Sequence, residues 1–179
     1  MKAVPRLALL AAVLAALAVP AGGVAASAGA QGQTRLPALE SSILSALNGV
    51  RVTHGLRPLR ISPGLTAAAV QHTAEMLQDD YFDHTSADGT AFDRRVARYY
   101  PFGSRYHRWA VGENLVYEAP DLTAAEAVSL WMASPEHRRN ILDPTWRDIG
   151  IAAVHGTDAG ATFGGGDVTI VTTDFGART

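Results

Sequence analysis

The chain has 179 residues and a formal net charge of −2 at pH 7, and 47% of its residues are hydrophobic. This balance indicates a globular protein, because disordered chains contain fewer apolar and more charged residues. The near-neutral charge and the lack of a basic run give no indication of binding to nucleic acid or to an anionic membrane. Since the sequence contains no cysteine, disulfide bonds and a lipid-modified cysteine anchor are excluded.

The first thirty residues have the pattern of a secretory signal peptide. Lys2 and Arg6 precede an apolar run over 7–19, and small residues follow as far as Ala30. The apolar run is too short for a comfortable membrane span. We therefore expect cleavage after Ala28 or, preferably, Ala30. The mature protein is then secreted, monomeric and without a stable membrane anchor.

Residues 31–38 are expected to form a short flexible lead-in, and residues 39–176 a single domain. Apolar residues at helical spacing predict helices over 39–54, 63–79, 91–99, 124–133 and 135–142. Thr90 is the expected cap of the third helix, and Thr123 is expected to form a capping box with Glu126 at the start of the fourth. Alternating apolar residues predict an antiparallel strand pair near 149–153 and 168–171. This order of elements predicts an α+β fold in which helices pack over a small sheet.

The helix predicted over 135–142 carries a histidine near its start. Ser134 is a favoured N-cap residue, and we expect its hydroxyl to accept a hydrogen bond from the backbone N–H of His137. The positive end of the helix dipole and the adjacent Arg138 and Arg139 disfavour protonation, so His137 is expected to be neutral near pH 7. Neutral imidazole binds metal or accepts a proton. From this stretch alone, an ordinary structural histidine is the preferred interpretation.

Two other polar residues lie among apolar neighbours. His84 follows two aromatic residues in a loop, where functional residues are common. Glu113 is flanked by apolar residues, so its carboxylate must be paired, hydrogen-bonded or ligated, and a structural role and a site role both remain open. Gly112 beside it allows another element to approach closely. His72 lies on an apolar helix stripe and is interpreted as a core residue.

Three stretches in this order resemble the CAP superfamily, or SCP domains, which include cysteine-rich secretory proteins, antigens and pathogenesis-related plant proteins. The matching stretches are Phe82-Asp83-His84, Gly112-Glu113-Asn114-Leu115, and Trp131-Met132-Ala133-Ser134-Pro135-Glu136-His137-Arg138 with Asn140-Ile141-Leu142. The chain is more similar to the short bacterial branch of the family. The resemblance extends over nearly all of residues 39–176. It implies a three-layer α-β-α sandwich with a small central antiparallel sheet and a cleft.

The resemblance assigns four residues to this cleft: His84, Glu113, Asn114 and His137. His84 matches the first of two family histidines, and Glu113 the first of two glutamates. His137 is the histidine of the bacterial Ser-Pro-x-His motif. The second family glutamate is replaced by Ser134, and the second family histidine has no counterpart over 168–175. The complete set of four is therefore not present.

This residue set is compatible with several functions. His84, His137 and Glu113 are suited to holding Zn²⁺ or another divalent metal with an open fourth position, or to acting as acid and base. The first expectation is a secreted module whose cleft binds a metal or a small ligand, lipid-like or glycan. The alternatives are a metal-assisted hydrolase of the cell envelope and a protein-interaction module with a vestigial cleft. The expected partner is a small apolar ligand or an envelope component, and not nucleic acid.

Overall fold

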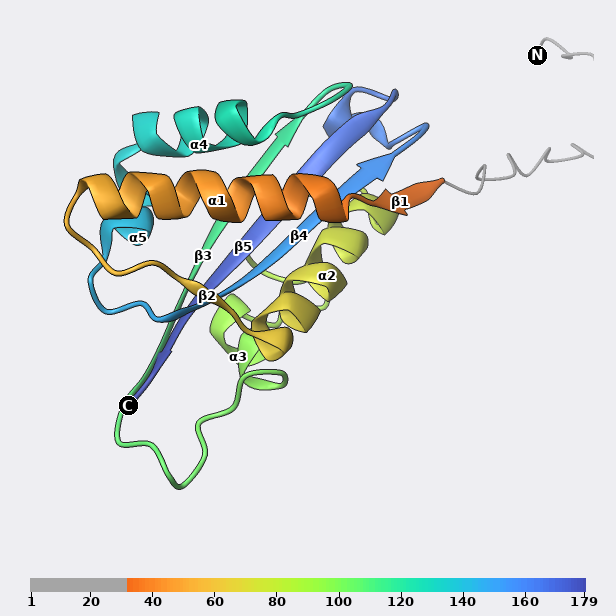
Figure 1. The fold of residues 1–179 in the computed structure, drawn as a ribbon. Coiled ribbons are helices and arrows are strands. Elements are labelled where there is room, and N and C mark those ends of the chain that lie inside the picture. Colours follow the sequence, from red (N-terminus) through yellow and green to blue (C-terminus); the bar gives the residue numbers. More distant parts are fainter. Residues whose placement is uncertain (1–31) are drawn as a thin grey trace, which may run out of the picture.

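The computed structural model describes residues 32–179, so the expected signal peptide lies outside the described residues. A central sheet is covered by helices on both faces (Figure 1), which confirms the α+β fold and the α-β-α layering. The helices are α1 (Pro37–Thr53), α2 (Pro63–Gln78), α3 (Phe92–Ala97), α4 (Ala124–Ala133) and α5 (Pro135–Leu142), with a short 3₁₀ helix at Ala161–Phe163. The strands are β1 (Gln33–Arg35), β2 (Arg60–Ile61), β3 (Trp109–Glu118), β4 (Asp148–Gly156) and β5 (Val168–Arg178). Within residues 32–179, no helix is long and apolar enough to cross a membrane.

The sheet is built around β5, which pairs antiparallel with β4 on one side and with β3 on the other. The strand order is β1-β4-β5-β3, and β2 adds a short parallel pairing to β4. The sequence analysis assigned no strand to β3. Helices cover both faces of this strand, so apolar residues occur at successive positions and the alternation that marks a half-exposed strand is lost.

Within the expected lead-in over 31–38, the described residues 32–38 are not a flexible segment. Residues 33–35 form β1, where Thr34 pairs with His155 of β4, and α1 begins at Pro37. The three residues of β1 are all exposed. Because backbone pairing and not apolar burial joins this strand to the sheet, its side chains give no apolar pattern from which to predict it.

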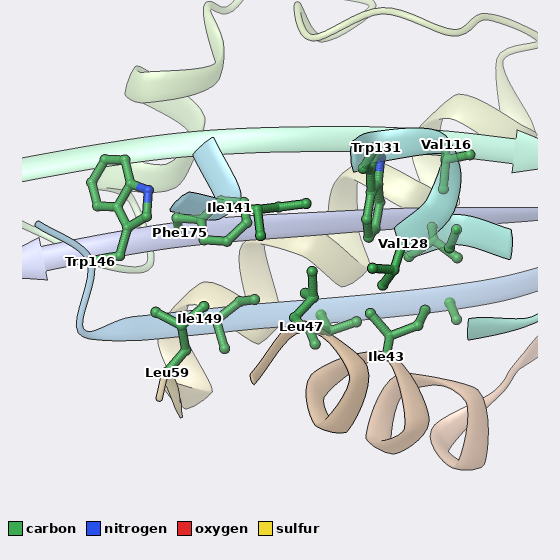
Figure 2. Packing of buried hydrophobic residues seen from close by; sticks show 14 of the residues in the cluster. Ile43, Leu47, Leu59, Val116, Val128, Trp131, Ile141, Trp146, Ile149 and Phe175 are labelled. Atoms are coloured by element: carbon green, nitrogen blue, oxygen red, sulfur yellow. The ribbon is translucent and has the colours of Figure 1, made fainter. Parts of the chain in front are cut away.

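The two faces of the sheet have separate hydrophobic cores. Helices α1, α4 and α5 pack on one face, where Leu47, Trp131, Ile141 and Phe175 meet (Figure 2). Helix α2 packs on the opposite face against β4 and β5, and α3 lies beside it against β3. The core on this second face contains Leu65, Ala68, Met76, Leu77, Val96, Tyr100, Leu115, Val154 and Ile170.

The predicted N-caps of three helices have different outcomes in the structure. Thr123 forms the predicted capping box with Glu126 at the start of α4. Ser134 occupies the N-cap position of α5, but its side chain makes no capping hydrogen bond, so the expected bond to His137 is wrong. Thr90 does not cap α3 either, because that helix begins one residue later than predicted, after Ala91.

We expect Thr123→Ala to lower the free energy of unfolding by about 1 kcal/mol, because the backbone N–H of Glu126 at the start of α4 loses its acceptor. Ser134→Ala should change it by less than about 0.5 kcal/mol, since no cap bond is removed. Urea unfolding of the two variants in parallel measures the difference. Equal losses would show that the Ser134 hydroxyl caps α5 in solution.

Candidate functional site

The centre of the candidate site is the side chain of Glu113, which lies on β3 and faces α3. Its Oε1 lies 2.8 Å from Nδ1 of His84, and its Oε2 accepts a hydrogen bond from the guanidinium of Arg95. The Glu113 side chain is 1% exposed, whereas that of His84 is 50% exposed. One ring nitrogen of His84 is thus fixed by a buried carboxylate, which leaves the other, Nε2, on the solvent side.

Arg95 connects this carboxylate to the loop that carries His84. Its Nη1 donates to the carbonyl oxygen of His84 at 2.9 Å and to the Ser86 hydroxyl at 3.3 Å. The Arg95 side chain is 1% exposed. The Glu113 carboxylate pairs with this buried cation, although among the described residues the Arg95 Nε has no hydrogen-bond partner. Arg95 therefore fixes both the backbone and, through Glu113, the imidazole of His84.

A second set of hydrogen bonds, formed by side chains of α2, holds the same loop. His72 is fully buried, as predicted, and its Nε2 lies 2.9 Å from the carbonyl oxygen of Asp83. Glu75 accepts hydrogen bonds from the Ser86 hydroxyl and from the backbone N–H of Ala87, both at 3.1 Å. Helix α2 thus anchors both sides of His84 in the chain, and this pre-orders the imidazole.

The charges in this cluster shift the pKa values of its members in different directions. The hydrogen bond to Glu113 raises the pKa of His84. Burial raises the pKa of Asp174 well above its usual value, and the nearby charge of Glu113 adds to the effect. Burial works against ionisation of Glu113, but the His84 bond and the Arg95 charge hold its pKa below the usual value. The cluster therefore favours the ionised form of Glu113 and disfavours ionisation of the neighbouring Asp174.

Asp174 lies directly opposite Glu113 in the β3–β5 pairing and is completely buried. Among the described residues, neither of its carboxylate oxygens has a hydrogen-bond partner. The raised pKa follows from this burial, because burying an unpaired charge costs several kcal/mol more than burying a neutral carboxyl group.

The stretch from Trp131 to Leu142 covers the edge of β3 that faces away from β5. Asn140 donates to the Glu113 carbonyl at 3.0 Å, and the Trp131 indole donates to the Leu115 carbonyl at 2.9 Å. Asn140 also donates to the Asn114 side chain, and Asn114 donates to the His137 carbonyl at 3.1 Å. These side chains satisfy backbone acceptors that an exposed edge strand would leave open to another chain. Asn114 thus positions the helix that carries His137.

His137 lies on the other side of the edge strand from Glu113. Neighbouring side chains on a strand point to opposite faces. Glu113 accordingly meets α3 while Asn114 meets α5. Burial lowers the pKa of His137, and the charge of His84 lowers it further. The expected neutral state is thus supported, but the cause is burial and His84 rather than the neighbouring arginines. Of the predicted site residues, His84 and Glu113 are in direct contact, and His137 is close enough to His84 for their charges to interact.

The donor set does not fit a metal ion in this arrangement. Both carboxylate oxygens of Glu113 are already engaged by His84 and Arg95. Within residues 32–179, no group of three or more His, Cys, Asp or Glu side chains is arranged to hold a metal. Binding of Zn²⁺ by His84 and His137 would require a third ligand that this geometry does not supply.

Two residues of the cluster, Arg95 and Asp174, were not assigned to the site from the sequence. Arg95 holds the His84 loop by donating to the His84 carbonyl, and the sequence pattern does not single it out from its neighbour Arg94. Asp174 had an available signal, since it is an acidic residue within the apolar alternation of β5. Nothing in the linear sequence connects it to Glu113, because the pairing register of the two strands brings them together.

We expect NMR titration to give a pKa above the usual value of about 6.5 for His84 and a pKa below it for His137. In a Glu113→Gln variant the pKa of His84 should fall, since the carboxylate that stabilises its cation is removed. His137 provides an internal check: its pKa should rise as His84 becomes neutral. An unchanged His84 titration would contradict the contact described here.

A separate apolar groove lies between the N-terminal ends of α1 and α4. It has a volume of about 680 Å³ and is formed mainly by Leu36, Pro37, Ala38, Leu39, Leu122, Ala124 and Ala125. Arg35, Ser42 and Thr123 supply polar groups to its lining. The groove is wide open to solvent, and its apolar walls with few polar groups are typical of small-molecule sites. The sequence analysis did not identify this groove.

Residues 44–175 match the family model of CAP, the cysteine-rich secretory protein family. This match covers most of the chain, and the motifs around Glu113 and His137 lie inside it. The chain therefore belongs to the CAP family.

Two proteins of Bacillus subtilis (strain 168) are similar in sequence. YkwD is 35% identical over 118 residues, which are 65% of this chain and 43% of YkwD. The membrane protein YlbC is 31% identical over 113 residues, which are 63% of this chain and 30% of YlbC. The matched regions thus span less than half the length of each relative.

Solved structures share the fold at lower sequence identity. An extracellular SCP-domain protein from Bacillus anthracis str. Ames has a TM-score of 0.61 at 21% identity, covering 79% of this chain and 41% of its own. An outer surface protein from Borrelia burgdorferi has a TM-score of 0.64 at 18% identity, covering 83% of this chain and 100% of its own.

Proposed function

We propose that this chain is a secreted CAP protein that binds a small lipid-like molecule. The observation that carries the proposal is the apolar groove between α1 and α4. Its volume of about 680 Å³ is sufficient for a small ligand. Burial of a hydrocarbon chain there gains about 0.8 kcal/mol per methylene group. The surroundings of His84 are polar and charged, which makes them less suitable for an apolar ligand.

Titration with a fluorescent fatty acid tests this proposal. Ala125→Glu introduces a charge into the groove lining from an exposed position of α4. We expect it to weaken binding about tenfold or more, because the carboxylate must lose water when the ligand enters. Ser129→Glu adds the same charge to the same helix outside this lining and should leave affinity unchanged. Equal affinity in all three proteins, or no binding by the wild type, would contradict the proposal.

Secretion is the second part of the proposal. It is supported by the signal-peptide pattern and by the extracellular and outer-surface descriptions of the structural relatives. N-terminal sequencing of protein collected outside the cytoplasm should begin at Gly29 or Gln31. An intact Met1 on the exported protein would contradict cleavage.

The polar site favours a second candidate function, general acid–base hydrolysis in the cell envelope. His84 and His137 have pKa values shifted in opposite directions, which is the arrangement expected of an acid and a base. Hydrolysis of envelope glycan or ester substrates that is lost in His84→Gln would support this function. Loss with a chelator would instead indicate a metal-assisted reaction, and activity unaffected by His84→Gln would exclude this site as its origin.

A further inference from the structure

Positive charge is concentrated in one segment of an otherwise acidic domain. No acidic residue occurs between Asp93 and Glu113. The arginines of this interval are Arg94, Arg95, Arg98, Arg105 and Arg108. The whole chain has a net charge of −2, so the remainder is strongly acidic by comparison. We call residues 94–108 the basic segment. The overall charge of the chain gave no indication of membrane binding because it averages this segment with the acidic remainder.

Most of these charges are available to a partner. Arg95 is buried at the candidate site, whereas the other four arginines are not buried. Within residues 32–179, none of these four guanidinium groups forms a salt bridge with a carboxylate. Without a carboxylate in direct contact, these guanidinium groups are free to bind an anionic surface.

The segment also exposes aromatic side chains. The connection from α3 to β3 extends away from the three layers as a long loop (Figure 1, lower part, green). Phe102 in this loop is 55% exposed and Tyr99 at its start is 40% exposed. The basic segment thus combines exposed arginines with two exposed aromatic rings, a composition suited to the boundary between lipid headgroups and acyl chains.

The base of this loop is held in place. The Trp109 indole donates to the Tyr100 carbonyl at 2.8 Å, and the Arg178 guanidinium lies 3.6 Å from the centre of the Tyr100 ring. The backbone N–H groups of His107 and Arg108 donate to a Thr179 oxygen at 2.6 and 2.8 Å. With both ends fixed, Phe102 is presented outward and does not fold back onto the core.

We propose that the basic segment docks the domain reversibly on an anionic phospholipid bilayer. Arginines on both sides of Phe102 would contact lipid phosphates, and the Phe102 ring would enter the interfacial region. A soluble polyanion matches the charges but offers no apolar region for the exposed aromatics, so the observations favour the bilayer. Such docking is peripheral and reversible, and it requires no membrane-spanning segment.

Vesicle sedimentation tests the proposal. Residues 32–179 contain every described strand and core cluster, so a chain of these residues folds as a unit and avoids the apolar leader. It should bind phosphatidylglycerol–phosphatidylcholine vesicles at low salt, bind pure phosphatidylcholine vesicles weakly, and dissociate at high salt. Arg105→Gln with Arg108→Gln should weaken partitioning about fivefold per arginine. Phe102→Ala should weaken it roughly tenfold.

Matched variants separate docking from general effects of charge and hydrophobicity. Arg57→Gln with Arg139→Gln removes the same charge from exposed positions elsewhere, and Leu130→Ala removes another exposed apolar side chain. These controls should partition like the wild type. Equal losses in the controls, absence of binding to anionic vesicles, or equal binding to neutral ones would overturn the proposal. An unchanged Phe102→Ala variant, with binding abolished by soluble polyphosphate, would assign the segment to a polyanion instead.

Discussion

Gly150→Ala should lower the free energy of unfolding by about 3 kcal/mol or more. Gly150 lies on β4, where the first turn of α2 packs directly on the strand. A methyl group at this position would overlap backbone atoms of Leu65 and Thr66. Backbone atoms cannot rotate away as a side chain does, so the helix must shift from the sheet. Urea unfolding gives the loss, which is a large fraction of the stability of a typical domain.

Gly49→Ala is the matched control. Gly49 is exposed within α1, and an added methyl group would meet no atom within 4 Å there. Alanine has the higher helix propensity, so this variant should be more stable by about 0.5–1 kcal/mol. A loss below about 1 kcal/mol for Gly150→Ala would show that α2 does not contact β4 as closely as described.

Close approaches of this kind mark the limit of what the sequence predicts. Helical spacing and the Thr123 cap located α4 correctly, since both signals depend on residues near one another in the chain. The role of Gly150 depends instead on α2, whose contacting residues are far earlier in the chain. Only Gly112 was identified as a point of close approach, and an added methyl group there would meet Trp146 at 3.0 Å.

The candidate site was likewise predicted from the sequence only in part. The resemblance assigned His84 and Glu113 to one cleft, and in the structure Nδ1 of His84 lies 2.8 Å from Oε1 of Glu113. It did not indicate that Glu113 needs the buried cation of Arg95. Nothing in the sequence distinguishes Arg95, which is buried, from the exposed arginines beside it. Arg51 is a second case: it is buried in α1 and donates to the carbonyl oxygens of Ile141 and Asp143 at 2.7 and 3.0 Å. Such residues are defined by the acceptors that the fold brings to them.

The motif at the start of α5 acquires a structural explanation that the sequence did not suggest. The Ser134 hydroxyl was expected to position His137, yet Asn114 does so through the His137 carbonyl. Asn140 and Trp131 satisfy carbonyl groups of the β3 edge. Much of this stretch therefore protects an edge strand, and the same contacts hold the backbone of His137.

Arg95→Met should be the most damaging substitution at the site, with an expected loss of about 3–5 kcal/mol at pH 7. Methionine keeps much of the side-chain volume but leaves the Glu113 carboxylate, which is 1% exposed, without its buried cation. The His84 carbonyl and the Ser86 hydroxyl lose a donor as well. Arg94→Met, at the adjacent exposed position, should change stability by less than about 0.5 kcal/mol.

The pH dependence identifies the cause of this loss. In the wild type, the folded-state pKa of Glu113 is lowered: burial opposes ionisation, but the His84 bond and the Arg95 charge outweigh it. Its ionised form therefore contributes stability above the pKa of the unfolded chain, and this is lost as the pH falls through the folded-state pKa. Without Arg95 the Glu113 pKa must rise. Protonation then removes the unpaired charge, so the difference between Arg95→Met and the wild type should shrink between about pH 7 and about pH 4.5.

A double variant completes the test. Glu113→Gln together with Arg95→Met removes both buried charges, and it should be less destabilised than the sum of the two single variants. Its stability difference from the wild type should also depend less on pH than that of Arg95→Met alone. Strict additivity, or a loss in Arg95→Met that does not change over this pH range, would mean that packing alone accounts for the effect. Arg95 would then hold the loop of His84 in place without controlling the charge of Glu113.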